Sequence, residues 1–398
     1  MKILYIASGT GMTGGATKSL IAMICQAQAH GIDLEVVCPD HDGLTQWLNR
    51  EGFKVHVVRY RHVRLPFART LTDKLKWLPR LIHDYWINLK AIPKVKRIAL
   101  EFAPDIIHEN SSVINFGYKA SKALGVPDVV HIREYGYLDF RMRLPGRKKR
   151  LNSNQVFTIS ITKDIFRHLQ QDLNPRSTQI YDGIVTESDF RLIENKKKMF
   201  LYAGRIERAK GIDDLLEAYT DYSRQVKDPL PLYICGGCNH PEFLERLKKF
   251  VDDRGCSSYV KWLGERPDVA DYMAQAAATI IPSRFEGLGR VMPEAMANGS
   301  LCIARNTGGT KEQLDNGMEF TGAPIAIAYE DNLQLKKALL DITAAMEKGD
   351  AFMPGSKYRH MIDRSQKAVK EFFSEDSFGD KLIVFYNKIL SAGKSKSE

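Results

Sequence analysis

The chain has 398 residues, of which 44% are hydrophobic, and a formal net charge of +10. That length exceeds what one hydrophobic core usually organises, so we expect two domains. The chain has no apolar stretch long enough to cross a bilayer, and its start lacks the pattern of a cleaved signal peptide. Six cysteines without a paired framework suit a reducing compartment, which predicts a cytoplasmic protein.

The positive charge is concentrated in the first half of the chain. Residues 1–200 contain 31 Lys and Arg against 19 Asp and Glu, whereas the remainder contains 27 against 29. Basic residues gather among aromatic ones at 59–97 and again at 141–150. This mixture indicates a peripheral surface that contacts anionic lipid, and the simpler alternative is a solvated helix face. No helix-turn-helix, zinc finger or RNA-binding signature favours nucleic acid.

A glycine-rich loop follows the first expected strand, 2–7. Residues 9–14 spell GxGxxG, which taken alone suggests a dinucleotide-binding oxidoreductase. Asp40 comes later than the offset of roughly 20 residues at which that fingerprint expects a ribose-binding acid. Gly14 and Gly15, which open a helix, fit equally well a loop whose backbone N–H groups contact phosphates.

Strand and helix patterns alternate through the first half, as expected of a doubly wound parallel sheet. Strands are expected at 35–38, 105–108, 128–130 and 156–160. His131 then follows a strand and should lie at its carboxyl edge, facing a ligand cleft. Glu134 is a more speculative partner for that histidine or for an acceptor, and His108 and Glu109 are weaker candidates at the preceding strand.

A second candidate site follows the strand expected at 200–204. Arg205 and Lys210 bracket a tight connection before a helix, which suits a diphosphate clamp made of a planar fork and a point charge. The alternative is a pair of solvated loop cations. Cys235 and Cys238 form a single CxxC with no second pair nearby, so we expect no zinc site.

Two glutamates eight positions apart are the most informative feature of the second half. Glu286 lies on the loop after an expected strand, and Glu294 lies in the first turn of the next helix. Gly287 and Gly289 remove side chains from this loop, so a ligand can approach its backbone closely. Two carboxylates beside such a loop suit the hydroxyls of a sugar and a ribose, although an exposed acidic loop would look the same.

Together these segments resemble the retaining glycosyltransferases of family 4, which have the GT-B architecture. The resemblance rests on Gly-Arg after a strand, on Lys-Gly shortly after it, and on Glu-x7-Glu running into Glu-Ala-Met-Ala. A glycine pair, Gly308-Gly309, with the downstream Glu312 completes the series. Pro293 departs from the usual aliphatic residue, but proline is tolerated in a helix's first turn.

The resemblance implies a role for each candidate residue. Arg205 and Lys210 would bind the donor's diphosphate, Glu286 the transferred sugar, and Glu294 the ribose hydroxyls. His131 would lie near the donor sugar. The catalytic set is then Glu286, His131, Arg205 and Lys210, and the donor-binding set is Gly14, Gly15, Arg205, Lys210, Glu286, Gly287, Leu288, Gly289, Arg290 and Glu294.

The resemblance also implies a fold and an activity. The α/β fold would comprise two Rossmann-like doubly wound parallel-sheet domains, 1–185 and 199–365, joined by a linker at 186–198. A helix at 366–390 would cross back to the first domain, and 391–398 would form a tail. The enzyme would transfer a sugar from a nucleotide diphosphate-sugar, most simply a UDP-sugar, to a hydroxyl of a membrane-proximal or lipid-linked glycan, with retention of configuration.

Neither a cofactor nor a metal is expected. The triplet Asp40-His41-Asp42 is the only DxD-like sequence that we find, and it reads as a polar turn. Two alternatives stay open at this point. One is an NAD(P)-dependent oxidoreductase that uses the amino-terminal glycines, and the other is a non-catalytic basic adaptor for membranes or polyanions.

Overall fold

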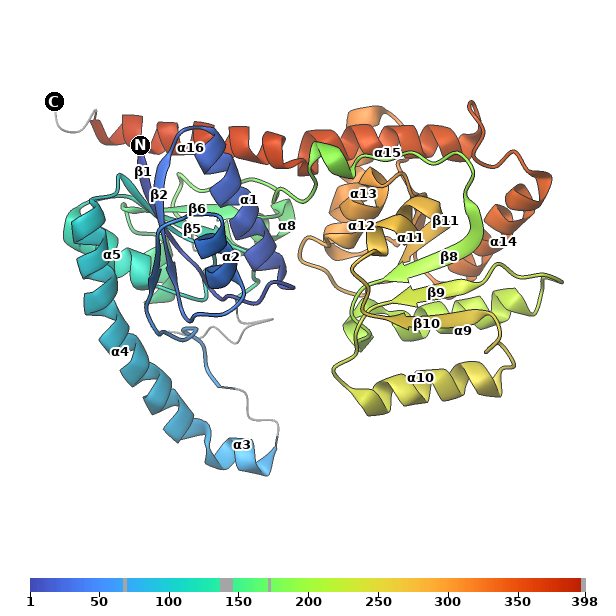
Figure 1. Cartoon of the computed structure of the whole chain (residues 1–398), viewed down its shortest axis with the longest axis horizontal. Coiled ribbons are helices and arrows are strands. Elements are labelled where there is room, and N and C mark those ends of the chain that lie inside the picture. The colour runs from blue at the N-terminus through green and yellow to red at the C-terminus, as the bar shows by residue number, and fades with distance from the viewer. Residues whose placement is uncertain (67–69, 137–145, 171–172, 395–398) are drawn as a thin grey trace. The chain divides into compact units, whose positions relative to one another are not determined.

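The structure, a computed structural model, describes residues 1–66, 70–136, 146–170 and 173–394, so 141–145 of the second basic cluster lie outside the described residues. The chain forms two compact units, which we call unit 1 (Met1–Gly183 with Glu375–Glu398) and unit 2 (Ile184–Ser374; Figure 1). The segment 186–198, expected as a linker, belongs to unit 2. No described helix is both long and apolar enough to cross a membrane.

Unit 1 contains a parallel sheet that has seven strands within the described residues, in the order β3-β2-β1-β4-β5-β6-β7. The strands are β1 (Lys2–Ile6), β2 (Asp33–Cys38), β3 (Val55–Val57), β4 (Ile106–Glu109), β5 (Asp128–Ile132), β6 (Val156–Ser160) and β7 (Thr178–Gln179). The helices are α1 (Gly15–Ala29), α2 (Leu44–Arg50), α3 (Leu71–Leu75), α4 (Trp77–Phe102), α5 (Phe116–Leu124), α7 (Arg147–Leu151), α8 (Lys163–Leu169) and α16 (Glu375–Lys394).

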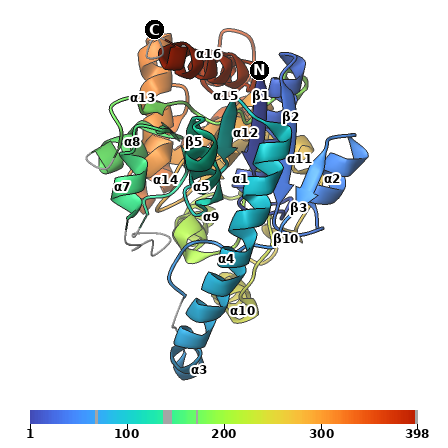
Figure 2. The same ribbon diagram turned by 90° about the vertical axis from the view of Figure 1, so that its left-hand side faces the viewer.

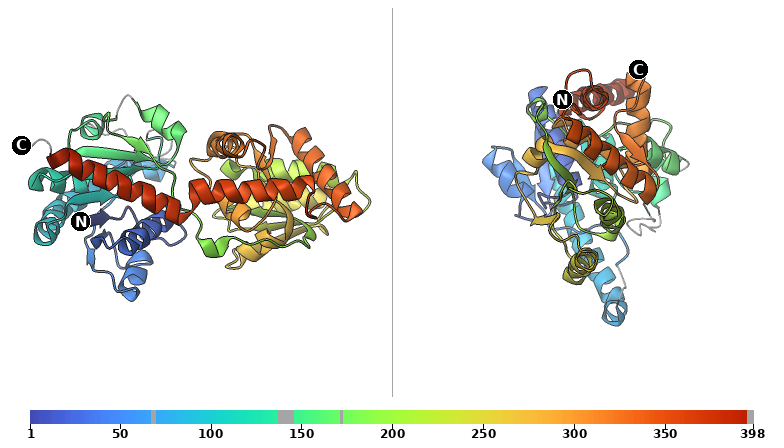
Figure 3. Two further views of the ribbon diagram at one scale, coloured as in Figure 1. Left: turned by 90° about the horizontal axis from the view of Figure 1, so that it is seen from above. Right: turned by 90° about the vertical axis from the view of Figure 1, so that its right-hand side faces the viewer.

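Both faces of the interior strand β1 are buried. Ile3 and Tyr5 face a core made with α1 and α16, whereas Leu4 and Ile6 face a core made with α4 and α5. Alternate residues of a strand point to opposite faces, so an uninterrupted apolar run is what a sheet covered on both sides requires. Figure 3 shows α16, in dark red, lying along unit 1.

Unit 2 contains a second parallel sheet, with six strands among the described residues, in the order β10-β9-β8-β11-β12-β13. The strands are β8 (Lys197–Ala203), β9 (Leu232–Cys235), β10 (Val260–Gly264), β11 (Ala276–Ile281), β12 (Cys302–Arg305) and β13 (Ile327–Tyr329). The α-helices are α9 (Ile212–Ser223), α10 (Pro241–Asp253), α11 (Val269–Gln275), α12 (Val291–Ala297), α13 (Gly308–Thr321), α14 (Asn332–Lys348) and α15 (Lys357–Phe373), with 3-10 turns at η2 (Glu187–Asp189) and η3 (Arg208–Lys210).

The helix expected at 366–390 is two helices in the structure. Ser374 takes an extended conformation, with φ −69° and ψ 147°, and ends α15. Helix α15 packs on α12 and α13 in unit 2, and α16 contributes Phe378, Leu382 and Tyr386 to the core of unit 1. The two parallel-sheet domains predicted from the sequence are confirmed, whereas the single C-terminal helix predicted with them is replaced by α15 and α16.

Candidate active site

Lys210 and Glu286 form the centre of the candidate site in unit 2. Lys210 ends η3, which follows β8, and Glu286 lies on the loop after β11. Because β8 and β11 are parallel neighbours, both loops leave the same edge of the sheet. Lys210 Nζ lies 2.5 Å from Glu286 Oε1, and Ser283 Oγ donates to the same oxygen at 2.8 Å. A cation and a carboxylate from distant parts of the sequence are therefore in direct contact.

The loop that contains Lys210 packs tightly against the end of β11. Gly211 has a φ of 66°, a conformation that favours glycine, and a Cβ there would lie 2.0 Å from Pro282 O. Arg284 N also donates to Ala209 O at 3.0 Å. No larger residue fits at 211 without moving one loop away from the other, so this glycine helps to hold Lys210 beside Glu286.

An ion-pair network around Asp214 also holds the elements that carry Lys210 and Glu286 together. Arg284 donates to both carboxylate oxygens of Asp214, at 2.5 and 2.9 Å, and Arg305 donates to Asp214 Oδ2 at 2.5 Å. Burial would raise the pKa of Asp214, but the hydrogen bonds from Arg284 and Arg305 outweigh it and lower that pKa. Asp214 therefore stays ionised and ties α9 to the loop after β11.

Helix α13 fixes the backbone of the loop at 286–289. Gly309 N donates to Glu286 O at 3.0 Å, and a Cβ at Gly309 would lie 2.1 Å from Gly287 O. The Gln313 side chain donates to Leu288 O and to Gly289 O, the latter at 3.0 Å. Gln313 was not anticipated from the sequence, because its position in α13 gives no signal of a contact with that loop.

Arg290 and Glu294 lie at the beginning of α12. Arg290 precedes the helix and Glu294 occupies its first turn, where an acidic side chain is favourable. Arg290 Nε lies 3.5 Å from Glu294 Oε1, and both side chains are partly exposed. The structure thus places the second glutamate beside a cation and open to a ligand.

Arg205 is apart from these groups. Its side chain is 65% exposed, and its Nη2 lies 3.2 Å from Glu207 Oε1. Its backbone is held, since Tyr202 Oη donates to Arg205 O at 2.7 Å. In this structure Arg205 and Lys210 do not clamp a common point, and only Lys210 contacts Glu286.

Gly14 and Gly15 lie where the sequence expects them, at the beginning of a helix. Gly14 is the N-cap of α1, which starts at Gly15, and its backbone N donates to Gly11 O at 3.1 Å. A glycine N-cap offers no side chain to the first-turn N–H groups, so these donors can meet an anion. Both glycines belong to unit 1.

The structure corrects the expectation for His131. Strand β5 runs to Ile132, so His131 lies within the strand, and its side chain is fully buried. The ring stacks on His108 at 5.6 Å, and Nε2 lies 3.4 Å from Asp182 Oδ1. Burial, with a smaller effect of Arg133, holds the pKa of His131 well below its ordinary value. His131 is a neutral core residue and does not face an open cleft.

The neighbouring candidates of unit 1 are also internal. Glu134 accepts from Ser111 and Ser112, and burial raises its pKa despite those bonds. Glu109 is ion-paired with Arg150 and accepts from the backbone of Gly117. Glu134 therefore does not accept from His131. In the same core His108 Nδ1 lies 2.5 Å from Tyr386 Oη.

Asp182 is a polar residue of unit 1 that sequence reasoning did not single out. It accepts from Ser19 Oγ at 2.8 Å and from Arg133, so it ties the first turns of α1 to the end of β5. Arg133 donates to Ser19 and to Asn110 as well. Nothing in the sequence around Asp182 indicates this ion pair, because its partner Arg133 lies far from it along the chain.

Asp40 and the cysteines behave as structural residues. Asp40 accepts from Thr10 Oγ1 at 2.5 Å and from Asp42 N at 3.1 Å, in a turn before α2. Cys235 is buried and Cys238 Sγ donates to Ile206 O at 3.3 Å. Within the described residues no group of three or more His, Cys, Asp or Glu side chains could hold a metal ion.

Comparison with known proteins identifies similar sequences and folds. The family "Glycosyl transferases group 1" matches residues 185–348, and the family "Glycosyl transferase 4-like domain" matches residues 14–170. An uncharacterised glycosyltransferase of Methanocaldococcus jannaschii is 26% identical over 61% of the chain and 66% of its own length. The lipopolysaccharide core biosynthesis mannosyltransferase LpcC of Rhizobium leguminosarum is 26% identical over 42% of the chain and 47% of its own length.

The whole fold also has a solved counterpart. The crystal structure of Anabaena HepE in complex with UDP matches with a TM-score of 0.74 and 18% identity, over 98% of the chain and 100% of that protein. At this identity the likeness concerns the fold alone. The chain spans less than two thirds of the length of each of the two curated relatives described above.

Proposed function

Because the chain belongs to the glycosyl transferase group 1 family, and so to the glycosyltransferases, we propose that it transfers a sugar from a nucleotide diphosphate-sugar to an acceptor hydroxyl, with retention of anomeric configuration. The contact between Lys210 and Glu286 carries this proposal. A diphosphate and the sugar that leaves it are covalently joined. Residues that bind each of them should therefore be adjacent, and a cation and a carboxylate 2.5 Å apart meet that requirement.

The remaining residues would extend the donor site towards the ribose on one side and towards the diphosphate on the other. Glu294 would bind the ribose hydroxyls, with Arg290 beside it, and the backbone of 287–289 would line the sugar. Arg205 would reach the diphosphate from its exposed position. Gly14 and Gly15 would offer backbone N–H groups to phosphate oxygens. His131 has no such role in this proposal, because its ring is buried in the core.

The chemistry requires stabilisation of separating charges. Breaking the anomeric C–O bond places negative charge on the leaving diphosphate and oxocarbenium character on the sugar. Fixed donors at the place where charge develops usually supply the largest share of catalysis. Lys210 and Arg205 would stabilise the diphosphate, and Glu286 would hold the sugar hydroxyls. We assign no protein base, because an oxygen of the leaving phosphate can accept the acceptor's proton, and we assign no metal.

We favour a UDP-sugar as donor. The support is the likeness to Anabaena HepE, which was crystallised with UDP, and the fold match covers almost the whole chain. The turn at 263–266, which begins at the end of β10, is the candidate for contacts with the base.

The acceptor would be a membrane-proximal or lipid-linked glycan, reached from the cytoplasmic face of the membrane. The support is a row of exposed apolar side chains on α3 and α4, which we call the apolar stripe. It is flanked by basic residues, as an interfacial helix should be. Its members, with exposed fractions from 49% to 80%, are Leu71, Leu75, Leu78, Ile82, Tyr85 and Trp86.

Release of UDP from UDP-glucose tests the proposal. We expect wild type to release UDP, slowly with water and faster with acceptor, and Glu286→Gln to lower kcat by about 100-fold. Glu245→Gln, which removes a carboxylate from an exposed ion pair on α10, is the control and should behave as wild type. Equal rates for Glu286→Gln and wild type would exclude the assigned site.

A further inference from the structure

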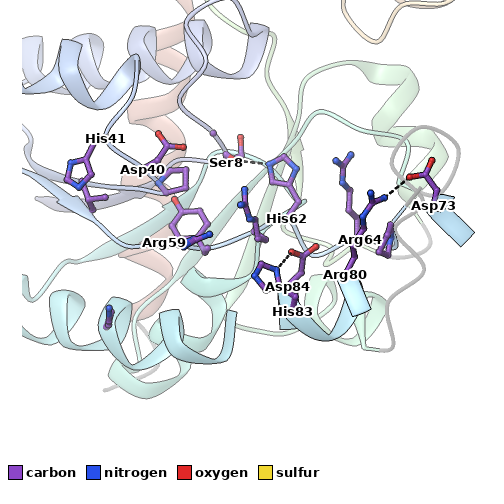
Figure 4. A pocket seen from close by; sticks show the side chains of 17 residues that line it. Ser8, Asp40, His41, Arg59, His62, Arg64, Asp73, Arg80, His83 and Asp84 are labelled. Atoms are coloured by element: carbon purple, nitrogen blue, oxygen red, sulfur yellow. Dashed lines mark hydrogen bonds and ion pairs between the residues drawn. The ribbon is translucent and has the colours of Figure 1, made fainter. Parts of the chain in front are cut away.

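A large cavity in unit 1 lies outside the donor site described above. Its volume is about 1060 Å³, which is ample for a phosphorylated sugar. Three loops line the cavity (Figure 4). They contribute Ser8 and Gly9 after β1, Asp40 and His41 after β2, and residues of the segment 59–66 after β3. The cavity therefore opens at the carboxyl ends of three adjacent strands, the edge where ligands bind in open α/β sheets.

The lining carries more cations than its own carboxylates neutralise. Arg80 is paired with Asp73 at 2.7 Å, and hydrogen bonds from Arg80 and Thr70 lower the pKa of Asp73. By contrast, the charged groups of Arg59, Arg61 and Lys94 make no ion pair or hydrogen bond with any described residue, although the Arg61 backbone is bonded to the Asn88 amide. Three cations without protein partners around one cavity are an arrangement that favours an anionic ligand.

The base of the cavity is held by a neutral histidine. His62 Nε2 donates to Ser8 O at 2.7 Å, as Figure 4 shows. Burial lowers the pKa of His62, and the nearby Arg64 and Arg61 lower it further, against the opposing effect of the hydrogen bond to Ser8 O. His62 thus fixes the loop after β1 to the segment after β3.

Helix α4 separates the cavity from the apolar stripe. At 100° per residue, Arg80, His83 and Lys94 lie on the side of the helix opposite to Leu78 and Ile82. One side of α4 therefore lines a basic cavity while the other is apolar and exposed. A ligand whose anionic group lies close to a membrane surface could therefore contact the basic cavity while the apolar stripe contacts the membrane.

We propose that this cavity binds a phosphate or diphosphate group of the acceptor, through Arg59, Arg61 and Lys94. The proposal rests on the function proposed above, since it names the chemical class of that acceptor. Arginine forks match phosphate oxygens in pairs, and lysine adds a point charge. The remaining volume would hold the sugar whose hydroxyl is glycosylated.

Calorimetric binding of inorganic pyrophosphate tests this assignment. The full chain is first saturated with UDP, so that pyrophosphate cannot occupy the donor site. We expect wild type to bind pyrophosphate. The double variant Arg59→Gln/Lys94→Gln should bind it with an affinity lower by a factor of about ten or more. The control Lys90→Gln/Arg97→Gln removes one lysine and one arginine from α4 outside the cavity lining and should bind as wild type.

Equal affinities in the two double variants, or no pyrophosphate binding by wild type, would overturn the assignment. Tight binding of glucuronate in place of pyrophosphate would also overturn it, because the anion would then be a carboxylate. A failure of UDP to bind would instead contradict the donor site. The pyrophosphate comparison is then repeated in Arg205→Gln/Lys210→Gln, which disables that site and keeps the two outcomes distinct.

Two further probes identify the source of the phosphate. Glucose 6-phosphate represents a soluble acceptor, and phosphatidylcholine vesicles with and without a polyprenyl diphosphate represent a lipid-linked one. Binding of either probe that weakens in Arg59→Gln/Lys94→Gln supports the cavity and indicates which source it uses. Binding of both probes that is unchanged in that variant contradicts the proposal.

Discussion

Two histidine rings stack in the interior of unit 1, and neither is charged at neutral pH. Burial lowers the pKa of His108 and of His131 well below 6.5, with smaller effects of His131 and Arg133 on His108 and of Arg133 on His131. The folded state therefore excludes a proton that the unfolded chain binds below about pH 6.5. Stability contributed by each ring is present above that pH and is lost as the pH falls.

The loss can be measured by comparing wild type with His131→Gln in urea denaturation at several pH values. We expect the wild-type unfolding free energy to fall relative to that of the variant below about pH 6.5, by about 1.4 kcal/mol per pH unit. The comparison removes the opposite contribution of the buried carboxyl groups, whose raised pKa values are common to both proteins. A difference independent of pH would contradict the lowered pKa of His131, because the ring would then take up its proton equally in the folded and unfolded states.

At the scale of elements, the beginning of α13 determines the shape of the loop at 286–289. A Cβ at Gly309 would lie 2.1 Å from Gly287 O, so one backbone must move. We expect Gly309→Ala to lower kcat/KM by about tenfold or more through displacement of Glu286. A steady-state assay of UDP release measures this effect.

The control lies at the other end of the same helix. Gly322 is the C-cap of α13 with a φ of 74°, and a Cβ there would meet nothing within 4 Å. Gly322→Ala should cost about 1 kcal/mol of stability, because the backbone is left-handed, and should leave kcat/KM unchanged. Equal kinetic losses in the two variants would contradict a specific role for Gly309.

Helices α3 and α4 yield a prediction about membranes. Figures 1 and 2 show α3 and the adjoining end of α4 extending beyond the sheet of unit 1. We expect the triple variant Leu75→Asn/Leu78→Asn/Ile82→Asn to bind anionic vesicles about tenfold more weakly in a sedimentation assay. Met318→Asn/Leu333→Asn, which removes exposed apolar side chains from unit 2, should bind as wild type. Undiminished binding of the triple variant would exclude the apolar stripe as the contact.

The sequence predicts strands better than it predicts helix ends. Parallel strands covered on both faces are continuous apolar runs, which is why 156–160 is found with its observed bounds. The break at Ser374 is not visible, because apolar spacing continues across it from Phe373 to Phe378. An extended residue there interrupts the helix without interrupting the pattern.

At the scale of the whole molecule, the sequence indicates which loops form the site but not which side chains touch. Strand order brings Lys210 and Glu286 to one sheet edge, and this follows from a doubly wound fold. The contact between them depends on Gly211 and on the Asp214 network, which involve residues far apart in sequence. The prediction that His131 faces a cleft is wrong because a position near a strand end does not reveal how deeply the side chain is buried.

Calorimetric binding of UDP, GDP, ADP and NAD to wild type and to Glu294→Ala tests the central claim most directly. The account predicts that wild type binds a nucleoside diphosphate, with UDP favoured, and that Glu294→Ala weakens this binding about tenfold. Glu319→Ala, an exposed position on α13, should bind as wild type. Binding of NAD that is indifferent to Glu294, with no binding of a nucleoside diphosphate, would contradict the account and favour the oxidoreductase suggested by the amino-terminal glycines.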